Sequence, residues 1–176
     1  MKNYIYLAVS ACVIGLLAIS SNAFADTDAV YAQVSSLQNQ IPKGSQLVTL
    51  EQADDLNGID QPTPSKLVIK EPGTYIVIAA GQPGVDKNAT SAGGVVDLWL
   101  MKNGQNVPNS GVRQFLATPQ STSVIISQAI LPLKTGDSLS FGYSANKPLH
   151  GLIATNGTSN QPAIPSIIVS VYKIGS

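Results

Sequence analysis

The stretch VVDLWLMKNGQNVPNS, which runs from Val95 to Ser110, decides the fold of this chain. It begins with an apolar run of the kind that favours a β-strand. Asn103 and Gly104 follow, and both tolerate the positive φ that a tight two-residue turn requires. Residues 105–107 supply a short return strand. The stretch is therefore predicted to be a β-hairpin.

Alternation along the first strand of this hairpin separates two faces. Val96, Leu98 and Leu100 share one face, which is wholly apolar. The other face carries Asp97 and Trp99 and is mixed in character. We expect such a hairpin to lie between a hydrophobic core and a second contact surface.

The composition of the whole chain is typical of an all-β domain rich in turns. Its 176 residues include 15 Gly and 11 Pro, and only 11% are charged. Runs with the 3.6-residue period of amphipathic helices are almost absent. The 10 Lys and Arg balance the 10 Asp and Glu, so the formal net charge is zero. This balance gives no electrostatic basis for binding nucleic acid or an anionic membrane.

Residues 1–25 have the pattern of a secretory signal peptide. Lys2 supplies the charge at the start, residues 5–19 are apolar, and residues 23–25 are an Ala-Phe-Ala cleavage site. A membrane anchor is disfavoured because the apolar run is short, and lipidation of Cys12 would leave too short an apolar region. We expect a secreted or extracellular protein, with the periplasm and the cell surface as alternative locations. The only Cys leaves with the peptide, so no disulfide is expected.

Residues 26–45 are predicted to form an N-terminal leader ahead of the main domain. Val30, Val34, Leu37 and Ile41 recur at spacings of four, three and four, which favours a short amphipathic helix. An apolar stripe of this length is too short to stabilise a coiled coil by itself, and a disordered leader is the alternative. In an oligomer, the leaders of several copies would pack as a small helical bundle.

Residues 46–176 are predicted to be a single domain of short strands separated by turns. Residues 51–65 and 81–94 are expected to be loops. Besides the hairpin, the expected strands cover residues 46–50, 66–70, 74–80, 112–116, 123–131, 138–143, 149–154 and 166–174. Regular spacing of this kind predicts an all-β sandwich or jelly roll of antiparallel strands.

Four segments of this domain occur in an order that resembles the tumour-necrosis-factor-like superfamily, which includes the globular head of the first complement component and bacterial and phage relatives. They are EPGTYIVIAA (71–80), DLWLMKNGQNVPNS (97–110), ILPLKTGDSLSF (130–141) and SIIVSVYKI (166–174). The resemblance implies a jelly roll of about ten strands over residues 46–176 that assembles as a compact homotrimer. The chain departs from many extracellular members in lacking a collagen-like stalk.

The surplus of apolar residues also favours an oligomer. A two-layer sandwich needs one apolar face on each strand, but several strands of this chain are apolar on both faces. The second faces would form exposed patches that monomers usually avoid. We predict that Tyr75, Trp99 and Tyr172 lie in the interface of a homotrimer.

No catalytic, cofactor-binding or metal-binding residues are predicted. The only His is His150, beside Pro148 and Gly151, and no Ser has the G-x-S-x-G surroundings of a nucleophile elbow. Asp55, Asn57 and Asp60 place three oxygen-bearing side chains around Gly58, as calcium loops do, but the distant bidentate Glu is lacking. The simpler interpretation of this segment is a polar loop.

Three functions stand as hypotheses at this point. The leading one is a secreted, non-enzymatic binding module that recognises a protein or a glycan, in adhesion or host interaction. The alternative is a structural subunit of a coat, matrix or appendage whose only partner is itself. A hydrolase with paired carboxylates is the third, and it is disfavoured because most Asp residues lie in turns, where their side chains cap the backbone.

Overall fold

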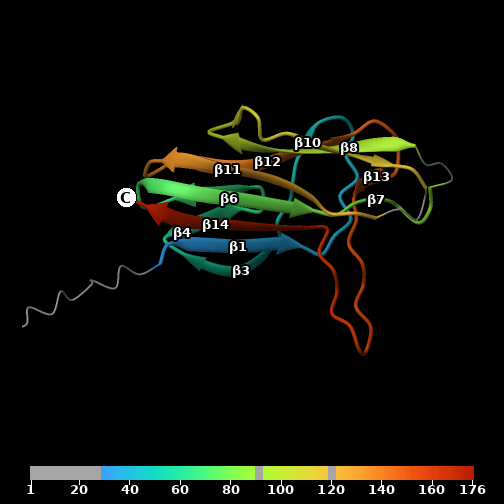
Figure 1. Cartoon of the computed structure of the whole chain (residues 1–176). Coiled ribbons are helices and arrows are strands. Elements are labelled where there is room, and N and C mark those ends of the chain that lie inside the picture. The colour runs from blue at the N-terminus through green and yellow to red at the C-terminus, as the bar shows by residue number, and fades with distance from the viewer. Residues whose placement is uncertain (1–28, 90–92, 119–121) are drawn as a thin grey trace, which may run out of the picture.

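The computed structural model describes residues 29–89, 93–118 and 122–176, and the predicted signal peptide lies outside them. This part of the chain has fourteen strands and no helix, so none of it forms a helix that could cross a membrane. The strands form two antiparallel sheets and a small two-stranded ribbon (Figure 1). The prediction of an all-β jelly-roll sandwich is confirmed, although the strands are more numerous than the ten expected.

The first sheet, which we call the β6 sheet, has the strand order β11-β6-β14-β1-β3. Its strands are β1 (Tyr31–Ser36), β3 (Gln52–Asn57), β6 (Gly73–Gly81), β11 (Ile125–Leu133) and β14 (Ile167–Gly175). On β6 the pleat turns Tyr75 and Val77 into the core and Ile76 outward. Ile76 pairs with Ile130 on one side and Tyr172 on the other, so these three outward residues lie in a row.

The second sheet, which we call the β8 sheet, has the strand order β10-β8-β12-β5-β4, with β2 beside β12 and β9 beside β8. Its strands are β2 (Gln46–Leu47), β4 (Ile59–Thr63), β5 (Lys66–Ile69), β8 (Gly94–Lys102), β9 (Gln105–Asn106), β10 (Val112–Leu116) and β12 (Ser138–Ala145). The small ribbon pairs β7 (Pro83–Val85) with β13 (His150–Leu152).

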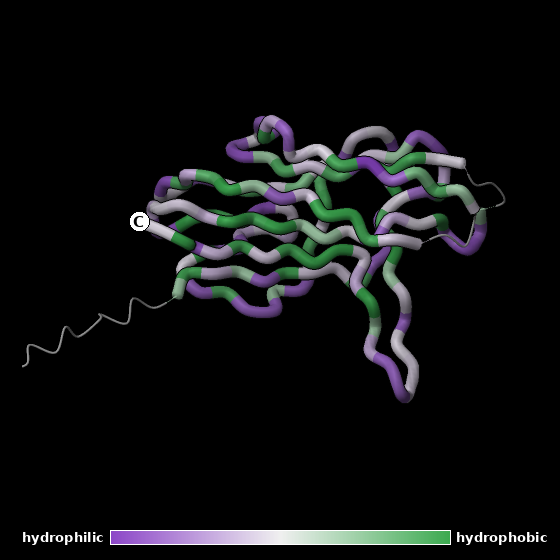
Figure 2. The backbone as a smooth tube through the Cα atoms, viewed as in Figure 1, coloured by the Kyte–Doolittle hydropathy of each residue, from purple (hydrophilic) through white to green (hydrophobic). Residues whose placement is uncertain are grey.

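The hydrophobic core fills the space between the two sheets. Val77 and Val169 enter it from the β6 sheet, and Leu98 and Phe141 enter it from the β8 sheet. Figure 2 shows apolar residues recurring along the strands and polar residues gathered in the turns. Each fully buried side chain of this kind contributes about 1.5–3 kcal/mol, so this core stabilises the sandwich without disulfides. Residues 153–165 form an arm that projects from the sandwich (Figure 1).

The predicted hairpin is confirmed in detail. Asn103 and Gly104 have φ of 51° and 76°, the positive values that the turn requires. The strands on either side pair through Lys102 and Gln105. The Asn103 side chain also donates from Nδ2 to Oδ1 of Asp137 at 2.8 Å, which ties the turn to the start of β12.

The helix expected within residues 26–45 is wrong for the part that the structure describes. Residues 31–36 form β1, which pairs with β14 on one side and β3 on the other. Val30 and Val34 are both buried, as a helix would have placed them. Alternate residues of a strand share a face, so two residues four apart also lie on one face of a strand, and this spacing does not distinguish the two structures. Because β1 belongs to the β6 sheet, the sandwich begins before Gln46 and these residues are not a separate leader.

The loop expected over residues 51–65 is also wrong. The chain forms β3 and β4 there, with Gly58 between them at a φ of 70°. β3 is the last strand of the β6 sheet and β4 is the last strand of the β8 sheet. Edge strands are commonly polar because one side faces water, so this segment resembled a loop. The loop expected over residues 81–94 is likewise interrupted by a strand, β7, whose three residues are buried.

Candidate functional site

Tyr75, one of the three predicted interface residues, is fully buried in the core. Its phenol donates a hydrogen bond to the Glu71 carbonyl oxygen at 2.7 Å, and burial raises its pKa above the ordinary value of 10.0. The prediction is wrong for this residue because both faces of its strand are apolar. The pleat places Tyr75, rather than Ile76, on the core side.

Tyr172 lies on the outer face of the β6 sheet, where half of its surface is exposed. Its ring stacks on that of Tyr31 in the neighbouring strand, with centroids 5.9 Å apart and an interplanar angle of 28°. A pair of this kind adds about 0.5–1.5 kcal/mol beyond area burial. A hydrogen bond with the Asp55 side chain raises the pKa of the Tyr31 phenol. The two tyrosines therefore form an ordered aromatic border on this face.

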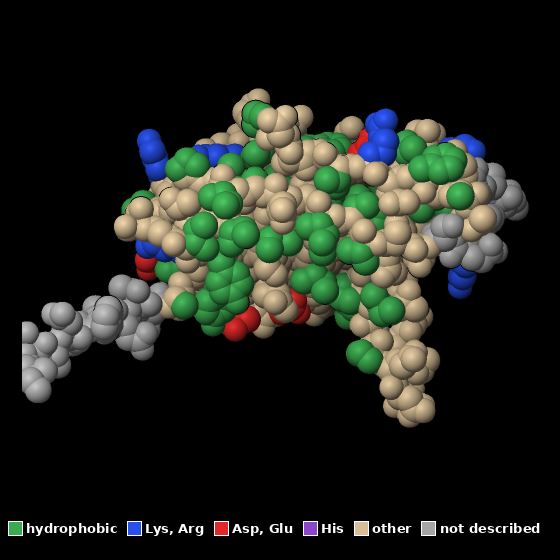
Figure 3. All heavy atoms as spheres, in the orientation of Figure 1, with side chains coloured by type: hydrophobic (Ala, Val, Ile, Leu, Met, Phe, Trp, Pro, Cys, Tyr) green, Lys and Arg blue, Asp and Glu red, His purple; other side chains and the backbone are tan. Residues whose placement is uncertain are grey.

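The outer face of the β6 sheet carries a contiguous set of apolar side chains, which we call the isoleucine face. Its members come from three adjacent strands: Ile126, Ile130, Ile76, Ile78, Ile168 and Tyr172. The register places Ile126 and Ile168 on either side of Ala80, one row away from Ile78. Figure 3 shows apolar side chains gathered over these strands.

The isoleucine face is well exposed for an apolar surface. Ile130 is 62% exposed, Ile126 is 51% exposed and Ile168 is 38% exposed. Single apolar side chains on a surface are ordinary, but a contiguous group of them marks an interaction site. The alternating pattern of residues 123–131 could have indicated that Ile126 and Ile130 share one face of a strand, but the interface prediction did not include them.

Trp99 lies on the outer face of the opposite sheet. It is half-buried, and its Nε1 donates a hydrogen bond to Oδ1 of Asn106 at 2.9 Å. Trp99 and Tyr172 therefore belong to two different surfaces. The three predicted interface residues fall in three places, one in the core and one on each outer face.

The segment from Asp55 to Asp60 does not form the polar loop that was expected. Its residues lie on β3 and β4, where the Asp60 carboxylate pairs with Nζ of Lys70 at 2.8 Å and Asn57 Nδ2 donates to the Ala29 carbonyl oxygen at 2.9 Å. Within residues 29–89, 93–118 and 122–176, no group of three His, Cys, Asp or Glu is placed to hold a metal ion.

Asp137 and His150 both make contacts within the fold. Asp137 pairs with Lys102 at 2.9 Å, and the Asn103 amide, as the main cause, lowers the pKa of its carboxyl to about 2. His150 is buried, with Nδ1 2.9 Å from the Pro148 carbonyl oxygen, and its Nε2 is buried without a hydrogen-bond partner among the described residues. These contacts tie turns and strands together, and they do not converge on one cleft.

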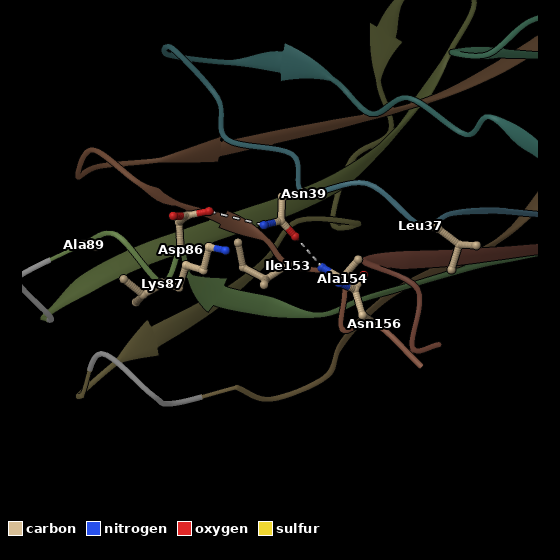
Figure 4. A pocket seen from close by; sticks show the side chains of 9 residues that line it. Leu37, Asn39, Asp86, Lys87, Ala89, Ile153, Ala154 and Asn156 are labelled. Atoms are coloured by element: carbon tan, nitrogen blue, oxygen red, sulfur yellow. Dashed lines mark hydrogen bonds between the residues drawn. The ribbon is translucent and has the colours of Figure 1, made fainter. Parts of the chain in front are cut away.

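A hollow of about 640 Å³ lies beside the small ribbon (Figure 4). Asn39 Nδ2 donates to Oδ2 of Asp86 at 3.3 Å, and the Ala154 N–H donates to Oδ1 of Asn39 at 2.9 Å. The backbone N–H of Asn88 is the main cause that lowers the pKa of Asp86. The polar groups of this hollow therefore hold three chain segments together.

Comparison with known proteins bears on the fold. No protein-family model matches the chain, and no curated protein sequence does. Among solved structures, the globular domain of the zebrafish complement 1qA protein superposes with a TM-score of 0.57, over 84% of this chain and 98% of that one, at 16% sequence identity. The chain has a C1q-like jelly-roll fold. The resemblance predicted from the four sequence segments is thereby confirmed at the level of the fold.

Proposed function

We propose that this chain is a secreted, non-enzymatic binding module that assembles as a homotrimer through the isoleucine face. The observation that carries the proposal is the contiguous exposure of Ile126, Ile130, Ile168 and Tyr172 on one outer face. Burying a half-exposed Ile contributes about 1 kcal/mol or more. Several such side chains in one patch favour association with a second apolar surface.

Two further observations support this proposal. The predicted signal peptide favours export, and the C1q-like fold is the one that the superfamily resemblance associates with compact homotrimers. Closed cyclic assembly covers an apolar face on every copy. The partner that such a module recognises is a protein or a glycan.

The test is the mass of the protein in solution. Multi-angle light scattering at micromolar concentration should give the mass of three chains. Ile130→Asp places a charge at the most exposed isoleucine of the isoleucine face and should shift the mass to one chain. The matched control is Phe115→Asp on β10, because Phe115 is 58% exposed but belongs to the other sheet. A wild-type mass of one chain, or equal loss of assembly in both variants, contradicts the proposal.

The second candidate is a structural subunit that binds only copies of itself. The projecting arm favours it, because Ile164 on this arm is 50% exposed and offers a second apolar contact. A structural subunit should form assemblies that grow with concentration beyond three chains. A binding module should stop at the trimer and retain a ligand site, so sedimentation across a concentration series separates the two.

A further inference from the structure

Trp99 lies among small residues on the outer face of the β8 sheet. The register places Gly142 of β12 directly beside it. On the other side β10 begins only at Val112, which pairs with Leu98, so Gly111 is the nearest residue to Trp99 along that strand. An added Cβ at Gly142 would overlap the indole ring, whereas one at Gly111 would meet nothing within 4 Å. The indole therefore covers Gly142 and leaves the Gly111 side open.

The open side forms a cavity of about 410 Å³ that is wide open to solvent. This volume is within the range of small-molecule sites, about 300–1,000 Å³. Trp99, Val107 and Gly111 line it, together with the polar side chains of Asp97, Asn106 and Arg113. Because the indole rests on Gly142 and its Nε1 is bonded to Asn106, the ring is held in one orientation at the cavity wall.

The polar groups of the cavity are paired and oriented. Arg113 donates from Nε to Oδ1 of Asp97 at 2.7 Å and from Nη2 to Oδ2 at 2.8 Å. A guanidinium has more N–H groups than these two bonds use, and a carboxylate oxygen accepts more than one hydrogen bond. Asn106 uses its oxygen on Trp99, so its amide N–H₂ carries further donors. The charges of Asp97 and Arg113 balance, which favours an uncharged ligand.

We propose that the cavity beside Trp99 binds a neutral saccharide, with one sugar ring stacked against the indole and its hydroxyls on Asp97, Asn106 and Arg113. A pyranose has an apolar face of C–H groups and a rim of hydroxyls that both donate and accept. The cavity offers the matching combination of an aromatic surface and a rim of planar polar groups. The inference deepens the proposed function, on which it rests, by naming the class of ligand that the module recognises.

The position of the cavity is compatible with the proposed assembly. Trp99 and Arg113 belong to the β8 sheet, whereas the isoleucine face is the outer face of the β6 sheet. The cavity therefore shares no residue with the isoleucine face.

Trp99 is the only Trp of the chain, so its fluorescence reports directly on this cavity. The full mature protein is titrated with the methyl glycosides of glucose, galactose, mannose, fucose and N-acetylglucosamine, and is then applied to an array of neutral oligosaccharides. Sialyllactose, adenosine monophosphate and free indole serve as the anionic and aromatic probes. We expect a saturable change of emission with at least one neutral saccharide, and protection of the indole from acrylamide quenching.

Two variants separate this site from a structural role of Trp99. Gly111→Leu places a side chain in the cavity and should abolish the response, because a Cβ at this position meets nothing within 4 Å and the Leu side chain extends into the open space. Arg113→Ala should weaken binding about tenfold or more, as expected for the loss of hydrogen bonds from a charged group. Phe115→Ala is the control, since this exposed aromatic residue of the same strand does not line the cavity. Circular dichroism confirms that each variant is folded.

The outcomes are distinguishable from those of the proposed function. Absence of any response to neutral saccharides, response to the anionic or aromatic probes only, or unchanged binding by both Gly111→Leu and Arg113→Ala overturns the inference. Light scattering on the same samples reports the assembly separately. A trimer that binds no sugar refutes the saccharide site alone, and a monomer that binds sugar refutes the assembly alone.

Discussion

Two glycines on either side of Trp99 provide a sharp test of how this side chain is packed. An Ala at Gly142 would place its Cβ within the volume of the indole ring. The ring would have to move outward, losing its contact with the β12 backbone and straining its hydrogen bond to Asn106. Overpacking of this kind costs about 1–3 kcal/mol. For a domain of this size that corresponds to a decrease in Tm of about 2–12 °C.

The opposite effect on stability is expected for Gly111→Ala. Its φ lies outside the left-handed region, and an added Cβ meets nothing within 4 Å. Gly→Ala at such a position restricts mainly the unfolded chain and stabilises by about 0.4–1 kcal/mol, which raises Tm by about 1–4 °C. Thermal unfolding is followed by circular dichroism at one protein concentration, because the Tm of an oligomer depends on concentration.

The fluorescence of Trp99 supplies the second readout. Emission of the folded Gly142→Ala variant should shift to longer wavelength because the displaced indole is more exposed to water, whereas emission of Gly111→Ala should stay near that of the wild type. If Gly142→Ala has the Tm and the emission of the wild type, the indole does not rest on Gly142. The orientation on which the saccharide site depends would then be wrong.

Three further predictions concern other parts of the chain. Intact-mass measurement of the exported protein should show cleavage after Ala25, and a retained Met1 or a lipid on Cys12 would contradict this. Gly104→Val should lower the unfolding free energy by about 1 kcal/mol or more, because β-branched residues resist the φ of 76° found there; an unchanged denaturation midpoint would refute it. The pKa of Asp137 falls from 3.8 to about 2 on folding, so its charge stabilises the fold above about pH 4 and this contribution is lost as the pH falls through 2. Asp137→Asn should therefore be less stable than wild type at pH 7, and the difference should shrink toward pH 2; a pH-independent difference would show that the carboxylate charge is not responsible.

Most strands in the middle of each sheet could be predicted from the sequence, but β1, which lies between β14 and β3, was expected to be a helix. Of the four edge strands, β10 has the predicted bounds and β11 is displaced by two residues, whereas β3 and β4 were expected to be loop. The central strands β6, β8 and β14 differ from the predicted bounds by one residue at each end. They are apolar because neighbouring strands and the opposite sheet cover them. β3 and β4 lie at sheet edges and carry the polar residues that edges require. Local composition is therefore a weak guide where one side of a strand faces water.

The choice of face could not be predicted where both faces of a strand are apolar. Tyr75 and Ile76 are adjacent, and either pleat would bury a large side chain. The fold selects Tyr75 for the core, where its phenol reaches the Glu71 carbonyl oxygen. The cavity beside Trp99 was beyond prediction for a different reason. It depends on Gly111 and Gly142, which are distant in sequence and become neighbours of Trp99 only through strand pairing.

The two outer faces of the sandwich suit different kinds of partner. Within the described residues, β6 and β11 contain no charged side chain, so covering the isoleucine face removes little charge from water and favours a protein surface. The outer face of the β8 sheet instead presents an oriented indole beside the Asp97–Arg113 ion pair, which favours a small polar ligand. A trimer closed through the isoleucine face would carry three identical Trp99 cavities, each on the sheet opposite to that face. Since linked sites raise avidity by about 10²–10⁴ when a ligand can span them, a weak site for one sugar ring would suffice to hold a multivalent glycan surface.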